Sequence, residues 1–354
     1  MFRRLIAALV IGGTAVLLLV MAWPQLFGVQ RLGVVVQLVS LRGLAIAVAL
    51  ALVVVLLLLA LFIRGFRPLA ASLTVLLLAF AAVSGAVLGT RGFGPGDSID
   101  PAQRAADSVT VMAWNTLGPA TEAVDVASLA LEVEADVVVL PETREEDAIA
   151  AALLMREAGQ PMWVLTSAYD RISPARSTSM LVSVSLGEYR FEPDARTTSV
   201  LPTLVATPVD GEGPTLVAVH AVAPIQGQMD NWRSDLALLA ELCSGDDIIM
   251  AGDFNSTIDH FSGLGSPDSG AQAGAQADPR AAAARLGDCT DAAALAGAGA
   301  VGTWPTSVPA PLGAPIDHVM ATDAWHVDGF RVIDDRDATG SDHRPVVAVL
   351  SPAA

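Results

Sequence analysis

Hydrophobic and polar positions follow two different patterns along this chain, and the change comes near residue 91. The first part contains three apolar stretches, Leu5–Trp23, Leu44–Ile63 and Leu69–Leu88. Each is close to the roughly 20 residues that a helix needs to cross the hydrocarbon core of a bilayer. The stretch 44–63 has no polar face to show to water, which argues against a core helix of a soluble domain. The pattern therefore predicts three transmembrane helices.

Residues 90–107 are rich in Gly, Pro and Asp, as is typical of a linker, and after them strand and helix periods alternate. Apolar or β-branched runs predict strands at 108–115, 135–142, 179–184, 215–221, 246–255, 314–322 and 344–350. Amphipathic runs predict helices at 121–134, 145–158 and 229–244, and the small residues of 266–280 predict a flexible loop. The chain thus divides into a membrane domain (1–89), a linker (90–107) and one α/β domain (108–354) whose strands are apolar enough to be buried on both faces.

The charges are divided in the same way as the apolar residues. Residues 1–91 contain seven Arg and no Asp, Glu or Lys, so the remainder carries all 37 acidic residues and a net charge of −24. A hydrophobic content of 53% is too high for an ordinary soluble domain, and the excess lies in the first part. Nucleic-acid-binding domains usually carry a basic surface, so an acidic domain without lysine disfavours tight binding to long nucleic acid.

The arginines also predict an orientation in the membrane. One pair, Arg3 and Arg4, precedes the first span, and a second pair, Arg64 and Arg67, lies between the second and third spans. The positive-inside rule places both pairs in the cytoplasm, so the α/β domain is expected outside it, in a multi-pass protein of the cell membrane. Three arginines on the predicted outer side oppose this orientation: Arg31, Arg42 and Arg91. A cleaved signal peptide is the alternative for the first stretch, but no typical cleavage site follows it.

Both cysteines, Cys243 and Cys289, lie in the acidic domain. In an oxidising exterior, a pair with no third candidate favours a disulfide. The alternative is two buried free thiols, which pack as small apolar groups.

Polar side chains that could bind a ligand or take part in catalysis lie where the predicted strands end. Any one of them has an ordinary explanation as a turn former, a helix cap or a core histidine. Six of the seven predicted strands nevertheless carry such a residue, and ligand sites in α/β folds form where strand ends converge. The residues are Asn115, Glu142, His220, Asp253, Asn255, Asp317, His318, Asp342 and His343.

Six short motifs around these residues occur in a recognisable order: "WNTLG", "LPET", "AVH", "GDFNST", "PIDHV" and "GSDHRP". Together they resemble the endonuclease/exonuclease/phosphatase superfamily, the deoxyribonuclease-I-like fold, over nearly all of 108–351. The resemblance implies an α/β fold, a four-layered α/β sandwich, here preceded by three transmembrane helices. It also implies divalent-cation-dependent hydrolysis of phosphate esters.

The chemistry of phosphate esters calls for the same residue types. The substrate is anionic, so attack on it needs charge neutralisation and an activated water. Mg²⁺ suits the first task and prefers carboxylate and amide oxygens, with Mn²⁺ or Ca²⁺ as alternative ions. Glu142 is the expected metal ligand, which the family resemblance supports, with Asn115 and Asp342 as further candidates.

The remaining candidates handle water and phosphate. Asp253, at the tip of an apolar strand, is expected to orient or deprotonate the attacking water. Asn255, two residues further on, is expected on the same face, where its amide can donate a hydrogen bond to phosphate. The resemblance assigns His343 to phosphoryl oxygens or proton transfer, paired with Asp317. It assigns His220 to phosphate stabilisation or leaving-group protonation, although no acidic partner for His220 is evident. Lesser candidates are His318, Asn231 and Trp304, the last of which either stacks on substrate or packs beside its proline.

The sequence therefore predicts a membrane-anchored, divalent-metal-dependent phosphoesterase that hydrolyses phosphodiester bonds, as a nuclease or a phosphodiesterase. One alternative is a phospholipid-directed phosphodiesterase or phosphatase, similar to a sphingomyelinase. Another is a catalytically silent binding module held at the membrane. The expected partners are the bilayer and a phosphate-ester substrate, and no protein partner follows from the sequence.

The orientation can be tested with a reporter that is active only in the cytosol, fused after Ala354. We expect the fusion to be silent, because the arginine pairs at 3–4 and 64–67 place the end of the third span outside. The same reporter inserted between the second and third spans should be active. A bright C-terminal fusion would place the acidic domain in the cytoplasm.

Overall fold

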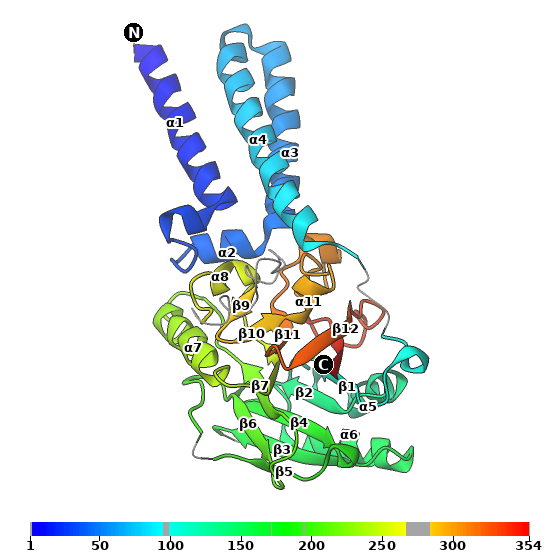
Figure 1. Cartoon of the computed structure of the whole chain (residues 1–354). Coiled ribbons are helices and arrows are strands. Elements are labelled where there is room, and N and C mark those ends of the chain that lie inside the picture. Colours follow the sequence, from blue (N-terminus) through cyan, green and yellow to red (C-terminus); the bar gives the residue numbers. More distant parts are fainter. Residues whose placement is uncertain (1, 95–98, 171, 194, 267–283, 354) are drawn as a thin grey trace. The chain divides into compact units, whose positions relative to one another are not determined.

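Figure 1 shows a computed structural model of the chain, which describes residues 2–94, 99–170, 172–193, 195–266 and 284–353. The chain divides into two compact units, Met1–Thr90 and Arg91–Ala354. All the strands of the described residues lie in the second unit.

The first unit is built from helices. Three are long, α1 (Phe2–Ala22), α3 (Arg42–Phe62) and α4 (Arg67–Arg91), and a short helix α2 (Val35–Ser40) precedes α3. Within the described ranges, three helices have the length and apolar composition of a membrane span, and they coincide with the three predicted stretches. The apolar pattern does not predict α2, which is too short to show a helical period.

The second unit begins at Arg91, the last residue of α4. The Arg91 guanidinium donates to both carboxylate oxygens of Asp259, over 2.9 and 2.8 Å. The backbone amide of Gly94 donates to the carbonyl of Gly297 over 3.2 Å. The first residues of the expected linker are therefore bonded within the second unit. Residues 95–98 of that linker lie outside the described residues.

Two mixed sheets form the centre of the second unit. The first has six strands in the order β12-β13-β1-β2-β4-β3, and the second has seven in the order β5-β6-β7-β8-β11-β10-β9. The pairs β1 with β2 and β7 with β8 are parallel, and the other neighbours are antiparallel. The strands are β1 (Val109–Ala113), β2 (Val137–Pro141), β3 (Met162–Ala168), β4 (Ser177–Ser183), β5 (Tyr189–Phe191), β6 (Leu204–Pro208), β7 (Thr215–His220), β8 (Ile248–Asp253), β9 (Arg285–Leu286), β10 (Cys289–Asp291), β11 (Asp317–Ala321), β12 (Trp325–Val332) and β13 (Val346–Pro352).

The sheets pack face to face because successive strand residues point to opposite sides. In β1, Val109 and Val111 belong to a core that also contains Leu216 of β7, whereas Met112 packs on the outer side with α5 and α6. Figure 1 shows α7 on the other side of the sheets from α5 and α6, which gives the order helix, sheet, sheet, helix. The predicted four-layered α/β sandwich is therefore confirmed. The helices of this unit are α5 (Ala123–Glu132), α6 (Glu145–Glu157), α7 (Met229–Leu242), α8 (Ile258–Phe261) and α11 (Ala292–Leu295).

All seven predicted strands and all three predicted helices of the α/β domain are present, with ends that differ by a few residues. The prediction misses β3, β5, β6, β9, β10 and β12. Of these, β3 and β12 are mostly half-buried, and β5, β9 and β10 have only two or three residues, so none shows a long apolar run. Residues 267–280 of the predicted flexible loop lie outside the described residues.

The predicted disulfide between Cys243 and Cys289 is confirmed. It joins the C-terminal end of α7 to the first residue of β10 across 46 positions of sequence. In the chain-entropy picture, closing a loop of this length stabilises the fold by about 4 kcal/mol, through restriction of the unfolded chain. The bond ties α7 to β10, a strand of the second sheet that ends at Asp291.

Candidate active site

The sheet topology brings the polar strand ends to one edge. β1 and β2 run parallel and end just before Asn115 and Glu142, and β7 and β8 run parallel and end at His220 and Asp253. β11 runs in the opposite direction, so its first residue, Asp317, lies opposite Asp253 in the register. Strand direction alone therefore places these five predicted site residues at the same end of the two sheets.

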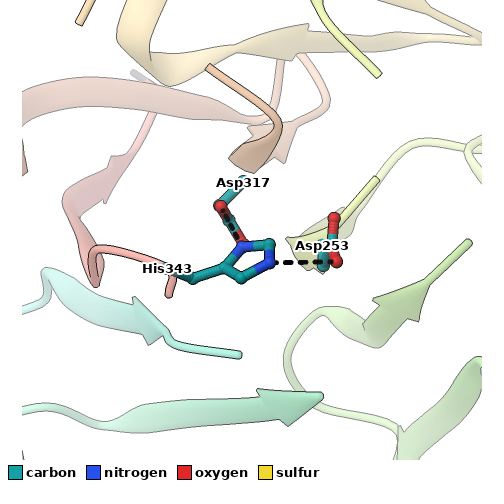
Figure 2. A group of neighbouring side chains, drawn as sticks. All are labelled: Asp253, Asp317 and His343. Atoms are coloured by element: carbon teal, nitrogen blue, oxygen red, sulfur yellow. Dashed lines mark hydrogen bonds and ion pairs between the residues drawn. The ribbon is translucent and has the colours of Figure 1, made fainter. Parts of the chain in front are cut away.

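A buried imidazole links two of these carboxylates (Figure 2). His343 Nδ1 lies 3.1 and 2.9 Å from the two carboxylate oxygens of Asp317, and its Nε2 lies 4.0 Å from Asp253 Oδ2. All three residues are at most 7% exposed. Their ligand atoms lie within 4.8 Å of one another, which makes them a candidate metal-binding group. The predicted pairing of His343 with Asp317 is present.

The charges of Asp253, Asp317 and His343 determine which of these side chains is protonated. Burial is the main reason that the pKa of Asp253 is raised, to about 7, with Asp317 adding to the effect and His343 opposing it. For His343, burial lowers the pKa, but the carboxylates of Asp317 and Asp253 outweigh burial and raise the pKa to about 10. The proton therefore stays on His343 at neutral pH, while Asp253 is able to exchange a proton near neutrality.

Asn115 connects the two sheets at the site. Its Nδ2 donates to Glu142 Oε1 over 3.2 Å and to Asp253 Oδ2 over 3.1 Å, while its Oδ1 accepts from the amide of Leu117 over 3.0 Å. Through its amide nitrogen, Asn115 thus holds the carboxylates of Glu142 and Asp253 close to each other. Burial raises the pKa of Glu142, and Asp342 contributes in the same direction, whereas Asn115 and His343 lower it.

Asn255 contacts Asp253 through a turn, and not through the alternation of side chains along a strand. β8 ends at Asp253, and Asn255 has a left-handed φ of 46°, so the expectation of one shared strand face is wrong. The two side chains meet through the turn instead. Asn255 donates from its backbone N to Asp253 Oδ1 over 2.8 Å and from Nδ2 to Asp253 Oδ2 over 3.0 Å. Its Nδ2 also donates to the carbonyl of Ala221 over 2.9 Å, so the amide faces protein acceptors.

Asp342 lies beside His343 and is held by an aromatic side chain. Trp304 Nε1 donates to Asp342 Oδ2 over 2.8 Å, which gives this tryptophan a polar contact in addition to its packing. Asp342 Oδ1 is buried, and no hydrogen bond reaches it from the part of the chain that the structure describes. His343 Nε2 is 3.9 Å away from this oxygen. This oxygen is free to accept a further hydrogen bond or to bind a cation.

His220 is fully buried behind Asp253. Its Nδ1 lies 3.2 Å from Thr178 Oγ1. The partner of His220, for which the sequence shows no acidic candidate, is therefore a hydroxyl of β4. Its Nε2 has no hydrogen-bond partner within the described residues. Burial lowers the pKa of His220 to about 3, and the positive charge of His343 acts in the same direction. His220 is therefore a neutral imidazole.

Several residues that support the site escape sequence reasoning. Ser341 Oγ donates to the carbonyl of Asn115 over 2.6 Å and accepts from the amide of His343 over 3.0 Å. Thr303 Oγ1 accepts from the amide of Asp317 over 3.2 Å. Ser and Thr in loops are common, and only the "GSDH" context of Ser341 offers a signal. Asn231, on α7, lies outside this group, where its Nδ2 donates to Oε1 of Gln228, the residue before α7, over 2.7 Å.

The architecture and the edge of polar side chains define the deoxyribonuclease-I-like class of α/β protein. The chain belongs to the Endonuclease/Exonuclease/phosphatase family, whose model matches residues 112–343. The match extends from β1 to His343 and so includes the strand ends described above. Membership in this family indicates a hydrolase of phosphate esters. No curated protein matches the chain significantly in sequence.

Solved structures confirm the fold at low sequence identity. An endonuclease/exonuclease/phosphatase from Beutenbergia cavernae is 18% identical, with a TM-score of 0.50, over 70% of this chain and 72% of that one. An AP endonuclease from Leishmania major is 16% identical, with a TM-score of 0.50, over 76% of this chain and 95% of that one. At these identities the likeness concerns the fold alone.

The neutral state of His220 predicts how stability responds to acid. The imidazole binds a proton in the unfolded chain below a pKa of about 6.5, but in the folded protein only near pH 3. Because the unfolded state binds more protons in this interval, stability falls as the pH falls, by about 1.4 kcal/mol per pH unit. Removing this contribution with His220→Gln should make the acid-induced fall in the thermal midpoint shallower in EDTA.

The matched control is His326→Gln, because His326 is an exposed histidine of β12 that is paired with Asp328. Its melting curve should follow the wild type across the same pH range. Equal acid slopes for wild type and His220→Gln would show that His220 does not stay neutral in the fold.

Proposed function

We propose that this protein is a membrane-anchored, divalent-metal-dependent phosphoesterase that cleaves phosphodiester bonds. The observation that carries the proposal is the buried Oδ1 of Asp342, which accepts no hydrogen bond among the described residues, beside Glu142 and the Asp253–His343–Asp317 group. Carboxylates that crowd together in a buried site raise one another's pKa unless a cation joins them. A divalent ion and a phosphate ester would complete this arrangement.

The donor set fits Mg²⁺ or a similar ion. Glu142 and Asp342 offer carboxylate oxygens, which hard divalent cations prefer, and the described residues of the site include no thiolate. Glu142 would be the main ligand, with Asp342 Oδ1 as the second. Asn115 was expected as a ligand, but its oxygen is bonded to Leu117, so we assign it to holding Glu142 and Asp253. When bound, the cation would neutralise charge on the phosphoryl oxygens.

Asp253 is the proposed general base. Its raised pKa suits removal of a proton from water near neutral pH, where a carboxylate of ordinary pKa would be a weak base. Asn255 and Asn115 fix its two oxygens with three hydrogen bonds, so the lone pairs have one defined direction. The charge on the water would then develop beside His343.

The two histidines would supply hydrogen bonds of different kinds. His343 is protonated and oriented by Asp317, so its Nε2–H can donate to a phosphoryl oxygen that gains charge in the transition state. His220 is neutral, and in the tautomer in which Nδ1 accepts from Thr178 Oγ1, Nε2 would carry the hydrogen. In that tautomer the Nε2–H, which has no partner among the described residues, would be suited to donate a hydrogen bond to the phosphate or to the leaving oxygen.

The surroundings favour an amphipathic substrate as a second candidate. Leu117, on the turn after Asn115, is 42% exposed, and its backbone amide donates to Asn115 Oδ1. An exposed apolar side chain beside the site suits a phospholipid better than a nucleic acid, and three apolar helices belong to the same chain. The acidic domain also repels long polyanions.

A substrate screen on the full-length protein in detergent tests this function. DNA, RNA, sphingomyelin vesicles and bis-nitrophenyl phosphate would each be incubated with Mg²⁺ and with EDTA. We expect hydrolysis of at least the generic phosphodiester, dependent on metal. Equal rates in EDTA would reject metal dependence, and the absence of hydrolysis in every arm would support a silent binding module.

Two substitutions should separate the metal ligand from the base. Glu142→Gln removes one anionic ligand at constant size, so activity should fall, and excess Mg²⁺ should restore part of it. Asp253→Asn removes the general base, so kcat should fall by about 10²–10⁴-fold, and excess Mg²⁺ should not restore it.

Glu157→Gln is a matched control, because Glu157 is exposed at the end of α6. It should retain wild-type rates at every metal concentration. A wild-type rate for Asp253→Asn on the best substrate would show that the base is misassigned.

A further inference from the structure

His318 lies directly behind the proposed catalytic group. It follows Asp317 in β11, so its side chain points to the opposite side of the strand. In the register it faces Gly252, the residue before Asp253. The side chain is 2% exposed, and none of its hydrogen bonds goes to Asp253, Asp317 or His343.

Both ring nitrogens of His318 face acceptors. Nδ1 contacts the carboxylate of Asp291, and Nε2 lies 2.8 Å from the carbonyl oxygen of Ser256. The Ser256 carbonyl can only accept, so Nε2 carries a hydrogen. Burial lowers the pKa of His318, but the carboxylate of Asp291 beside Nδ1 outweighs burial and raises the pKa, so the ring is an imidazolium. Asp291 is itself fixed, because its other oxygen accepts from the amide of Ala294 over 3.0 Å at the start of α11.

This ion pair lies in an apolar environment. The ring of His318 makes edge contacts with Phe254 and Phe261, at centroid distances of 5.3 and 5.4 Å. Asp291 is completely buried. Burying two opposite charges costs about as much as their attraction returns, so such a pair is weak evidence for a role in stability. Its contact with the Ser256 carbonyl points to another role.

The Ser256 carbonyl belongs to the turn that presents the base, residues 253–256. In this turn Asn255 has a left-handed φ of 46°, a conformation that persists only where surrounding contacts hold it. From one side, Trp232 Nε1 donates to the carbonyl of Asn255 over 3.1 Å and to Ser256 Oγ over 2.9 Å. From the other side, His318 Nε2 donates to the next carbonyl along the chain. The turn is therefore clamped between α7 and β11.

We propose that His318, held by Asp291, is a positioning residue that fixes the 253–256 turn and thereby the direction of the Asp253 carboxylate. It touches neither water nor substrate and acts through the Ser256 carbonyl. The inference rests on the proposed function in one respect, the assignment of Asp253 as the base. The clamp on the turn itself is a property of the fold and can be measured without substrate.

Two substitutions of His318 each keep one of its two hydrogen bonds and remove the other. His318→Asn can place its amide nitrogen near the position of Nδ1, which keeps the bond to Asp291 and loses the donor to Ser256. His318→Gln can place its nitrogen near the position of Nε2, which keeps the donor to Ser256 and leaves the Asp291 carboxylate without a hydrogen bond from residue 318. The Gln variant should be the less stable of the two, because an unpaired buried carboxylate is costly.

Activity should follow the opposite order. His318→Asn should lower kcat by about 10–100-fold with little change in KM, as for other partners that orient a site residue, and His318→Gln should retain most of the activity. Rates would be measured on the full-length protein per folded molecule. His326→Asn is the control, because His326 forms an exposed pair with Asp328 over 2.9 Å. If activity instead follows stability in the two His318 variants, the residue is structural and the proposal fails.

Amide hydrogen exchange provides a readout that needs no activity. In His318→Asn, peptides that cover residues 254–261 should exchange faster than in wild type, whereas His318→Gln and His326→Asn should not. Unchanged exchange in His318→Asn would overturn the proposal. If the wild-type protein hydrolyses no phosphate ester, the proposed function fails, and the exchange experiment still decides the role of His318. Asp253→Asn, assayed in parallel, shows whether the measured rate depends on the base.

Discussion

The site depends on keeping two buried carboxylates, Asp253 and Asp317, on either side of one protonated imidazole, His343. The antiparallel register of β8 and β11 forces the two carboxylates to be neighbours, and like charges in a buried site repel strongly. His343 offsets that repulsion only if its loop stays in place. Trp114 Nε1 donates to the His343 carbonyl over 3.0 Å, and Ser341 links the same loop to Asn115, which follows β1. Residues at the end of β1, in the first sheet, therefore hold the His343 cation next to the two carboxylates of the second sheet.

Much of this arrangement follows from the sequence, since the apolar strands and the polar residue at each strand end are both visible as patterns. Strand directions bring these residues to one edge within each sheet, and the Asn115–Asp253 hydrogen bond shows that the two edges meet. The missing details depend on contacts between distant segments. The hydroxyl of Thr178 beside His220 comes from another strand, and the left-handed turn at Asn255 replaces the strand alternation that the sequence pattern implies. Asp291, the partner of His318, lies on the three-residue strand β10, which shows no period at all.

The acidic net charge of the α/β domain limits which phosphate esters this site can bind. Residues 92–354 carry a net charge of −24, so an anionic substrate is attracted only where fixed donors or a bound cation compensate locally. The protonated His343 provides such a donor at the edge of the sheets. Small or lipid-borne phosphate esters need compensation at one phosphate, whereas a long nucleic acid needs it at many. The three long apolar helices have the length and composition of membrane spans.

Locating the metal tests the central claim most directly. Crystals of the full-length protein soaked with Mn²⁺ would be measured at a wavelength where manganese scatters anomalously. The account predicts an anomalous peak at the strand edge, bound by the Glu142 carboxylate at about 2 Å, with Asp342 Oδ1 turned towards the ion. A site that stays empty at saturating Mn²⁺, or an ion whose ligands exclude Glu142, would contradict it.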